Sequence, residues 1–277
     1  MAKITEVKEI NLPDLELYAS RSEVKLYRHD EPEPGLFAAE SLKVIDRALA
    51  AGYRPVSFLF EKNVFREKAA YLAERFPDTD IYLADEETMT GITGYRLTGG
   101  ALSLMRRKSL PSFVDICTGK KRLAVLEDVE NPANVGAIIR SAAALGIGGV
   151  LLTTDCTDPL YRRAVRVSMG TVFQVPWTIT GSGPALAEQL KAEGWTCLAL
   201  ALTEDALPLD SVRFASEEKA ALFLGAEGEG LKAETIKACD ASVIIPMAGG
   251  VDSLNVAAAS AVAFWAVSHQ IKDTYEK

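Results

Sequence analysis

Histidine and paired cysteine are scarce in this 277-residue chain, and their scarcity excludes several kinds of site. The sequence has two histidines and four cysteines, and the cysteines stand singly without a CxxC pair. Structural zinc sites, disulfide frameworks and Ser-His-Asp triads all need such residues in combination. We therefore expect no metal site, and we interpret the cysteines as small apolar thiols in a reducing cytosol.

Long apolar segments are missing as well. The longest runs from Val256 to Val267, well short of the roughly 20 residues that a membrane-spanning helix needs. The first residues lack the apolar stretch of a signal peptide. The expectation is a cytoplasmic protein that does not associate with a membrane.

Basic residues are outnumbered by acidic ones, and the net charge is −8. This balance disfavours a protein that coats nucleic acid non-specifically, but it permits docking of one structured RNA through local basic patches. Candidate patches are Arg106, Arg107 and Lys108; Lys120, Lys121 and Arg122; and Arg162, Arg163 and Arg166. The alternative for each cluster is a solvated loop or helix face.

The first hundred residues predict a small α/β domain. A turn is expected at 34–37, helices at 39–51, 66–76 and from 85 to 91, and strands at 56–60, 80–83 and 101–105. The basic, turn-rich stretch that follows is interpreted as a linker. The predicted division is a first domain at 1–108, a linker at 109–120 and a second domain at 121–277.

The second half alternates short apolar strands with helices. Strands are expected at 123–127, 149–153, 171–175, 195–201, 221–224 and 242–245, and helices at 135–145, 160–168, 184–192, 231–238 and 254–270. This alternation predicts a parallel sheet covered on both faces. Ligands of such sheets bind beyond the carboxyl ends of the strands.

Three motifs follow strands in this half, and the first is NPANVGAIIR at 131–140. Asn134 is expected to cap a helix. Arg140 lies six residues further on, and its long side chain could reach back to the strand ends because helical side chains lean toward the N-terminus. The alternative is an ordinary capped helix with one exposed arginine.

The second motif is LGAEGEGL at 224–231. Its glycines permit positive φ and close approach of the backbone to a ligand. The spacing is GxxGxG after a late strand, so it is not the dinucleotide fingerprint GxGxxG, and the sequence contains no phosphate-binding GxxxxGK[ST]. A flexible turn would account for the glycines but not for Glu227 held between them.

The third motif lies within IPMAGGVDSLNVAAA at 245–259. Ser253 or Asp252 is expected to cap the closing helix, with Asn255 in its first turn. The alanines that follow would let this helix pack closely against another backbone or against an adenosyl group.

In this order the three motifs resemble those of the SpoU/TrmH-type RNA ribose 2′-O-methyltransferases of the SPOUT superfamily, over residues 121 to 270. The resemblance implies a parallel α/β domain with a C-terminal trefoil knot, a homodimer, and S-adenosylmethionine as cofactor. The residues implied to contact the cofactor are Gly225, Ile245, Met247, Leu254 and Asn255. The first half is similar, in its order of elements, to the L30e-like substrate-binding domain of several members.

The implied reaction is methyl transfer to a ribose 2′-hydroxyl in ribosomal or transfer RNA. Arg140 is implied to be essential, either as the base or as a cation that stabilises the developing alkoxide. Asn134, Glu227, Ser253 and Asn255 would orient Arg140 and the ribose, and the basic clusters would contact RNA. The alternatives are methylation of an RNA base by the same fold, or a silent RNA-binding paralogue.

Overall fold

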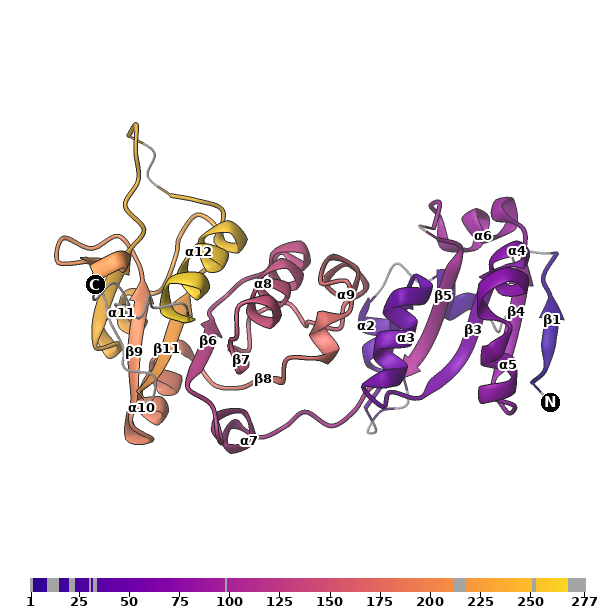
Figure 1. Ribbon diagram of the computed structural model, residues 1–277, viewed down its shortest axis with the longest axis horizontal. Helices are drawn as coiled ribbons and strands as arrows, with labels where there is room; N and C mark the ends of the chain where they lie inside the picture. Colours follow the sequence, from indigo (N-terminus) through magenta and orange to yellow (C-terminus); the bar gives the residue numbers. More distant parts are fainter. Residues whose placement is uncertain are drawn as a thin grey trace, which may run out of the picture. The chain divides into compact units, whose positions relative to one another are not determined.

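The chain folds into two units, each built around its own sheet (Figure 1). The computed structural model describes residues 2–8, 15–19, 23–29, 31, 34–97, 99–211, 218–250 and 253–268. The first unit comprises Met1–Ser109 and Leu160–Phe173, and the second comprises Leu110–Pro159 and Gln174–Lys277. The chain therefore crosses between the units three times. No helix in the described ranges is long and apolar enough to cross a membrane.

The sheet of the first unit has, in its described part, five strands in the order β1-β4-β3-β5-β2. β1, β4 and β3 are parallel, whereas β5 is antiparallel to both β3 and β2. The bounds are Ile4–Glu6 (β1), Leu36–Glu40 (β2), Pro55–Glu61 (β3), Asp80–Ala84 (β4) and Ala101–Arg106 (β5).

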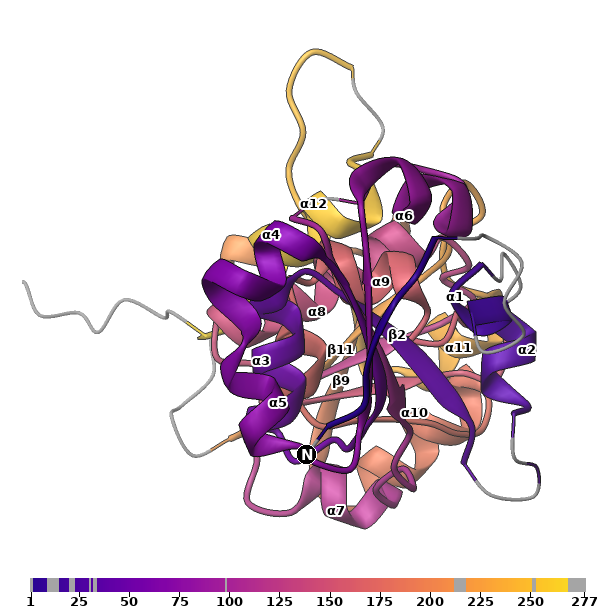
Figure 2. The ribbon, with the colours of Figure 1, turned by 90° about the vertical axis from the view of Figure 1, so that its right-hand side faces the viewer.

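Helices cover both faces of this first sheet (Figure 2). On one face lie α3 (Leu42–Ala50), α4 (Lys62–Val64), the π-helix η2 (Phe65–Ala69) and α5 (Tyr71–Arg75), and on the other lie α1 (Glu16–Ala19), α2 (Glu23–Tyr27) and α6 (Glu86–Thr93). Alternate residues of a strand point to opposite faces. Leu59 accordingly packs with Tyr18 and Met89, while its neighbours Phe58 and Phe60 stack on each other.

Strand β2 corrects the predicted turn at 34–37 and the predicted helix from residue 39. All five residues of Leu36–Glu40 are buried in a strand, and α3 begins only at Leu42. Local propensity misled the prediction, because alanine and glutamate favour helix over strand. Pairing with β5 and burial on both faces override that propensity.

The sheet of the second unit is parallel throughout its described strands, in the order β10-β12-β9-β11-β6-β7-β8. The bounds are Arg122–Leu126 (β6), Gly149–Leu152 (β7), Trp177–Ile179 (β8), Trp195–Leu200 (β9), Leu207–Pro208 (β10), Lys219–Leu224 (β11) and Ala241–Ile244 (β12). The predicted α/β class with a parallel sheet is confirmed.

Two groups of helices cover this second sheet. α8 (Pro132–Ala144) and α12 (Val256–Ser268) pack against each other (Figure 1). α7 (Phe113–Cys117), α10 (Gly183–Ala192) and α11 (Ala233–Ala238) contribute to one apolar cluster with β6, β9 and β11. The segment 109–120, expected as a linker, thus contains α7, whose Ile116 is fully buried in that cluster.

The predicted strand at 171–175 is wrong. Thr171–Phe173 form a short 3-10 helix (η3) that belongs to the first unit, and the strand comes later, at Trp177–Ile179. The ring of Phe173 lies 5.5 Å from that of Phe37 and 5.1 Å from that of Tyr53. A short apolar run cannot by itself distinguish a strand from a segment buried in another way.

Candidate active site

The three motifs lie at the carboxyl-terminal ends of neighbouring strands in the second sheet. β12, β9, β11 and β6 are successive neighbours in this sheet and run parallel. Their carboxyl ends therefore lie at the same edge. The first motif follows β6, the second follows β11 and the third follows β12.

A cavity of about 650 Å³ lies at this edge. Its wall comes from the ends of β9, β11 and β12, from the loop after each, and from the start of α12. The five residues implied to contact a cofactor all line it: Gly225, Ile245, Met247, Leu254 and Asn255. Glu227 and Ser253 also lie in the wall. The volume falls within the range of roughly 300–1,000 Å³ that is typical of small-molecule sites.

The loop after β11 folds back on itself to form one side of the cavity. The Gly230 N–H donates to the Ala226 carbonyl at 3.1 Å. A Cβ atom on Gly225 would lie 2.1 Å from the carbonyl carbon of Gly230, so only glycine fits there. Gly228 has a φ of 95°, which other residues rarely adopt. The glycines of the second motif are thus required by the loop itself.

Hydrogen bonds join side chains from all three motifs. The Asn255 Nδ2 donates to Asn134 Oδ1 at 3.3 Å, and the Asn134 Nδ2 donates to Glu227 Oε1. The carboxylate can only accept, so its bond fixes which end of the Asn134 amide faces Glu227. The structure therefore brings together Asn134, Glu227 and Asn255, which were predicted from separate segments.

The predicted capping role of Asn134 is wrong. The residue that caps α8 is Asn131, whose side chain accepts from the Ala133 N–H at 2.9 Å. Pro132 explains the shift, because proline is favoured at the first helical position and keeps the residue before it out of the helical conformation. Asn134 lies inside the first turn, where its amide bonds Glu227 and Asn255, two residues of the cavity wall.

The predicted capping of the last helix is also corrected. α12 begins at Val256, and the side chain of Asn255 accepts from the Ala257 N–H at 3.0 Å. Asn255 therefore caps the helix with its oxygen and binds Asn134 with its nitrogen. Ser253 is exposed in the cavity wall, and Asp252 lies outside the described residues.

Arg140 lies on α8, away from this hydrogen-bonded set. It is six residues beyond Asn134, or roughly 9 Å along the helix axis. Its side chain is exposed, and it is not among the residues that line the cavity. Its catalytic role stays a prediction.

The basic residues expected to contact RNA have different surroundings. Arg106, Lys121 and Arg163 are exposed. Lys108 donates to the Ala51 carbonyl at 2.6 Å, and Arg107 donates to the Leu36 carbonyl at 3.1 Å. These last two side chains take part in the packing of the first unit, and the RNA contacts of the whole set stay predictions.

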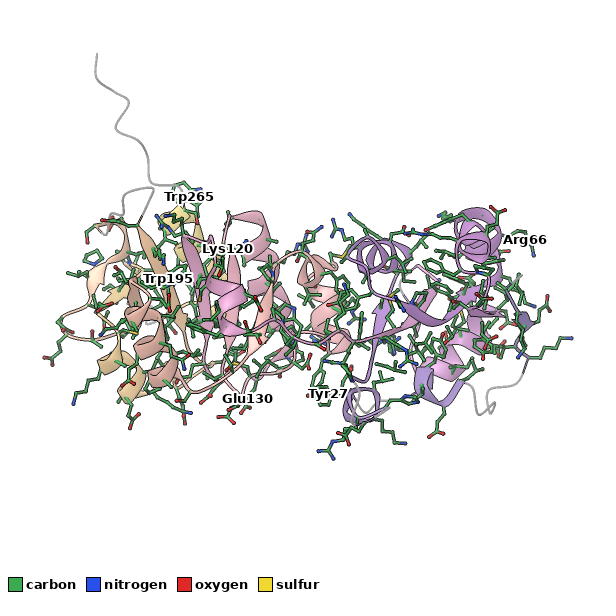
Figure 3. The ribbon with its side chains drawn as sticks, turned by 90° about the horizontal axis from the view of Figure 1, so that it is seen from below. Tyr27, Arg66, Lys120, Glu130, Trp195 and Trp265 are labelled. Carbon is green, nitrogen blue, oxygen red and sulfur yellow. The ribbon has the colours of Figure 1, made fainter. Side chains whose placement is uncertain are left out.

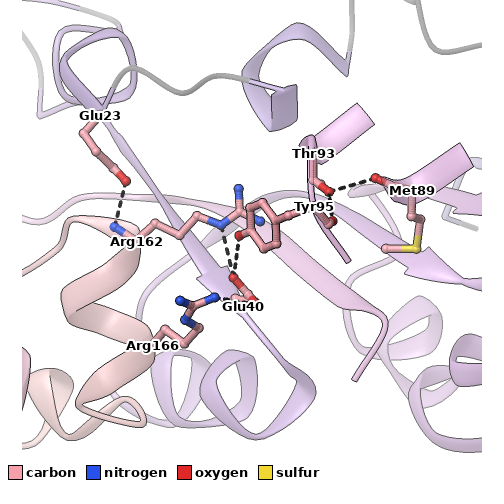
Figure 4. A network of polar contacts seen from close by, with 7 residues as sticks. All are labelled: Glu23, Glu40, Met89, Thr93, Tyr95, Arg162 and Arg166. Carbon is pink, nitrogen blue, oxygen red and sulfur yellow. Dashed lines mark hydrogen bonds and ion pairs between the residues drawn. The ribbon is translucent and has the colours of Figure 1, made fainter. Parts of the chain in front are cut away.

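Arg162 and Arg166 converge on a buried carboxylate that the sequence did not reveal (Figure 4). Glu40, only 1% exposed, accepts from the Tyr95 hydroxyl at 2.7 Å and from Arg162 Nε at 3.3 Å, and its other oxygen lies 3.6 Å from Arg166 Nη1. The Arg162 N–H, at the start of α9 (Arg162–Val167), donates to Glu23. Both arginines are thus structural partners within the first unit.

The cysteines are free thiols. Burial raises the pKa of Cys117 to about 11 and the pKa of both Cys197 and Cys239 to about 12. They are therefore protonated and weakly nucleophilic at neutral pH. No three potential ligands among histidine, cysteine, aspartate and glutamate cluster in the described parts of the chain.

The fold is shared with solved RNA methyltransferases. The crystal structure of an AdoMet-bound rRNA methyltransferase from Sinorhizobium meliloti aligns with 95% of this chain and 97% of that chain, with a TM-score of 0.79 and 25% sequence identity. Residues 121–265 match the profile of the SpoU rRNA Methylase family. The chain belongs to this family.

Two named relatives support the assignment. A protein of Mycobacterium bovis named as an uncharacterized tRNA/rRNA methyltransferase is 38% identical over 231 residues, which cover 83% of this chain and 80% of the relative. The 23S rRNA (guanosine-2′-O-)-methyltransferase RlmB of Ralstonia nicotianae is 33% identical over 192 residues, which cover 68% of this chain and 76% of the relative.

Proposed function

We propose that this protein is an S-adenosylmethionine-dependent methyltransferase that modifies a ribose 2′-hydroxyl in ribosomal or transfer RNA. The observation that carries the proposal is the cavity lined by the second and third motifs, with Asn134 of the first motif joined by hydrogen bonds to Asn255 and Glu227 in its wall. Family membership and the named activity of the relatives support the same reaction. The protein acts in the cytoplasm, where these RNAs are found.

The cavity suits the cofactor in size and chemistry. Ile245, Met247 and Leu254 offer apolar surface to the adenosyl group, and Gly225 allows the backbone to approach it closely. When bound, S-adenosylmethionine supplies an electrophilic methyl group on a positively charged sulfur. Glu227 places a carboxylate in the wall of the cavity, and its negative charge would favour binding of that cation.

Polar side chains of the site hold the ribose and handle its proton. Asn134, Ser253 and Asn255 orient the attacking hydroxyl, which aids the reaction by aligning the reacting atoms. Arg140 is essential and acts either as the base or as a cation that stabilises the alkoxide. Arg140 does not line the cavity of its own subunit. In the proposed homodimer each site lies near the subunit interface, where an Arg140 side chain completes it.

The surface of α12 supports the homodimer. This helix is apolar around its whole circumference, as is typical of a helix that becomes buried. Val262 and Trp265 are 43% and 52% exposed, and Figure 3 shows Trp265 on the outside of the second unit. A second copy of the chain covers this face. Sedimentation is expected to give twice the mass of the chain, and Val262→Asp is expected to give the monomer.

The finer architecture is part of the proposal. The C-terminal segment forms a trefoil knot around the cofactor, and residues 1–108 form an L30e-like domain that binds the RNA substrate. The high structural similarity to the Sinorhizobium enzyme over nearly the full chain supports both. Replacement of Arg106 and Arg163, two exposed arginines of the first unit, by alanine is expected to leave cofactor binding intact and to weaken RNA binding.

Arg140→Ala tests the catalytic assignment. We expect this variant to bind S-adenosylmethionine with wild-type affinity, measured by calorimetry, and to lose methyl transfer by a factor of roughly 10² or more. Arg66→Ala, which removes an exposed arginine outside the three basic clusters, serves as the control for lost charge. Turnover of Arg140→Ala at the wild-type rate would contradict the assignment.

A further inference from the structure

Glu127 is a buried carboxylate at the edge of the sheet that carries the cavity, yet it does not line the cavity. It follows the last residue of β6 and is 1% exposed. None of the three motifs includes it. A buried carboxylate is costly unless its oxygens are bonded, so its partners indicate what it does.

Glu127 is bonded to both ends of the glycine loop. Its backbone N–H donates to the Leu224 carbonyl at 2.9 Å, directly before Gly225. Its Oε2 accepts from the Lys232 N–H at 2.9 Å, directly after Leu231. One residue therefore fastens the loop where it leaves β11 and where it enters α11.

The second carboxylate oxygen secures α11 itself. Glu127 Oε1 accepts from the Thr235 hydroxyl at 2.6 Å, and Thr235 is fully buried. A Cβ atom on Gly183 would lie 2.1 Å from this oxygen and 2.3 Å from the Thr235 hydroxyl oxygen. The start of α10 thus packs directly on Glu127 and Thr235, and any residue larger than glycine at position 183 would collide with them.

The hydrogen bond to Asp128 is the main cause of the raised pKa of Lys232, and the charge of Glu127 adds to it. The ammonium of Lys232 lies 2.6 Å from Asp128 Oδ2 and is bound there. The hydrogen-bond donors recorded for Glu127 among the described residues are a backbone N–H and a hydroxyl, both neutral. The direct contacts of this carboxylate are therefore hydrogen bonds from neutral groups, and the charge of Lys232 acts on it without a hydrogen bond.

The same residue starts the turn that leads to the first motif. Only four residues separate Glu127 from Pro132, the first residue of α8. On one side it sets the position of Asn134, and on the other it sets the loop that carries Glu227. These two side chains are bonded to each other, and Glu227 lies in the cavity wall.

We propose that Glu127 is a positioning residue, which holds Glu227 against Asn134 by fastening both ends of the glycine loop and so keeps the cofactor cavity formed. The proposal rests on the proposed function for its effect on catalysis. The fastening of the loop is a claim about the fold and can be tested separately.

Three variants separate bonding from charge. Glu127→Ala removes both acceptors. Glu127→Gln keeps an acceptor for the Lys232 N–H and offers its amide as a donor to the Thr235 oxygen, so it is expected to restore both bonds. Thr235→Val removes one bond and keeps the carboxylate. Glu40→Ala, which deletes an equally buried strand-end carboxylate in the first unit, is the matched control.

The first readout is binding of S-adenosylhomocysteine and turnover with full-length protein. We expect Glu127→Ala to raise the Kd at least tenfold and to lower kcat as well, Thr235→Val to raise the Kd severalfold, and Glu127→Gln to stay within threefold of wild type. Glu40→Ala is expected to leave the Kd within twofold. A wild-type Kd and kcat in Glu127→Ala, or a Gln variant as defective as the Ala variant, would overturn the proposal.

The second readout needs no cofactor. Cys239 follows α11, and its N–H donates to the Thr235 carbonyl at 3.2 Å. Burial is the main cause of the raised pKa of Cys239, and the charge of Glu127 adds to it, so Glu127→Gln serves as the reference that has lost the same charge. If Glu127 fastens α11, alkylation of Cys239 at pH 8 is at least tenfold faster in Glu127→Ala than in Glu127→Gln, and it is unchanged in Glu40→Ala. Equal rates in Glu127→Ala and Glu127→Gln overturn the proposal even where the variant folds normally. Failure of the wild type to bind any cofactor contradicts the proposed function and leaves this second readout decisive.

Discussion

Glu40 and Glu127 are two buried carboxylates that the molecule satisfies in opposite ways. Each lies at the end of a strand and is 1% exposed. Glu40 is held in the first unit by the long side chains of Arg162, Arg166 and Tyr95. Glu127 is held in the second unit by a backbone N–H and a short hydroxyl side chain.

The difference lies in what each arrangement fixes. Long side chains can rearrange, and one oxygen of Glu40 has no hydrogen bond within the described residues although it lies 3.6 Å from Arg166. Both oxygens of Glu127 are bonded, at 2.9 and 2.6 Å, and one bond goes directly to the main chain. Charge pairing holds elements together, whereas bonds to the backbone fix the shape of a loop. The loop that lines the cavity is held by the second kind of contact, the bond from the Lys232 N–H to Glu127.

Glu40→Gln is expected to have the largest effect on stability. The neutral amide keeps the size of the side chain but leaves the Arg162 guanidinium, which is 13% exposed, without its charge partner. We expect the free energy of opening of β2 and α9 to fall by about 3 kcal/mol. Hydrogen exchange resolved by peptide measures this value, with the β6 and α11 peptides as internal control. An unchanged exchange rate at β2 would contradict the charge-based account of Glu40.

In the second unit, by contrast, Glu127→Gln is expected to cost little stability. Because its partners are neutral, the amide can satisfy them, and we expect a loss below about 1 kcal/mol. Glu127→Ala leaves two buried donors unpaired and is expected to cost about 2 kcal/mol. The same exchange experiment on β6 and α11 peptides checks both values. A Gln variant at Glu127 as unstable as the Gln variant at Glu40 would remove the distinction between the two sites.

One hydroxyl group binds each of the two carboxylates and can be deleted separately. Thr235→Val removes the bonded partner of Glu127 Oε1 and is expected to cost about 1.5 kcal/mol. Tyr95→Phe is expected to cost about 0.5 kcal/mol, because the same oxygen of Glu40 keeps its bond to Arg162. Thermal unfolding of the two single variants gives the order. A larger loss for Tyr95→Phe would show that the side-chain network is the more tightly coupled of the two.

The smallest expected effects come from two exposed helix caps, one in each unit. The Thr88 N–H lowers the pKa of Asp85 at the start of α6, and the hydroxyl and N–H of Ser112 lower the pKa of Asp115 at the start of α7. A lowered folded-state pKa contributes stability that is present above the ordinary value of about 3.8 and is lost as the pH falls through the folded value. Asp85→Asn and Asp115→Asn should therefore flatten the decline of Tm below pH 4 and change little at pH 7. A steeper decline in either variant would contradict the assigned direction.

The sequence predicts the local part of this structure well and the long-range part poorly. Most of the strands of the second sheet follow from short apolar runs, and two of the three motifs that follow them line the cavity. The predicted helix caps are wrong by two or three residues, because Pro132 starts α8 earlier than expected and α12 starts later, at Val256. Boundaries of this kind depend on a single hydrogen bond.

The buried carboxylates Glu40 and Glu127 show why long-range contacts could not be predicted from the sequence. Arg162 is 122 residues from Glu40, and Thr235 is 108 residues from Glu127. Pairings over such distances depend on how the sheets are ordered, which periodicity in one sequence does not specify. The only signal available was an acidic residue at the end of an apolar strand, and both glutamates carry it.

The most direct measurement of the central claim is mass spectrometry of nucleosides from RNA treated with the protein and isotope-labelled S-adenosylmethionine. RNA from cells that lack the protein provides the unmodified substrate. We expect the label to stay with the ribose after the base is released, and we expect Arg140→Ala to give no label. A label that leaves with the base, or equal labelling by the wild type and Arg140→Ala, would contradict the proposed function.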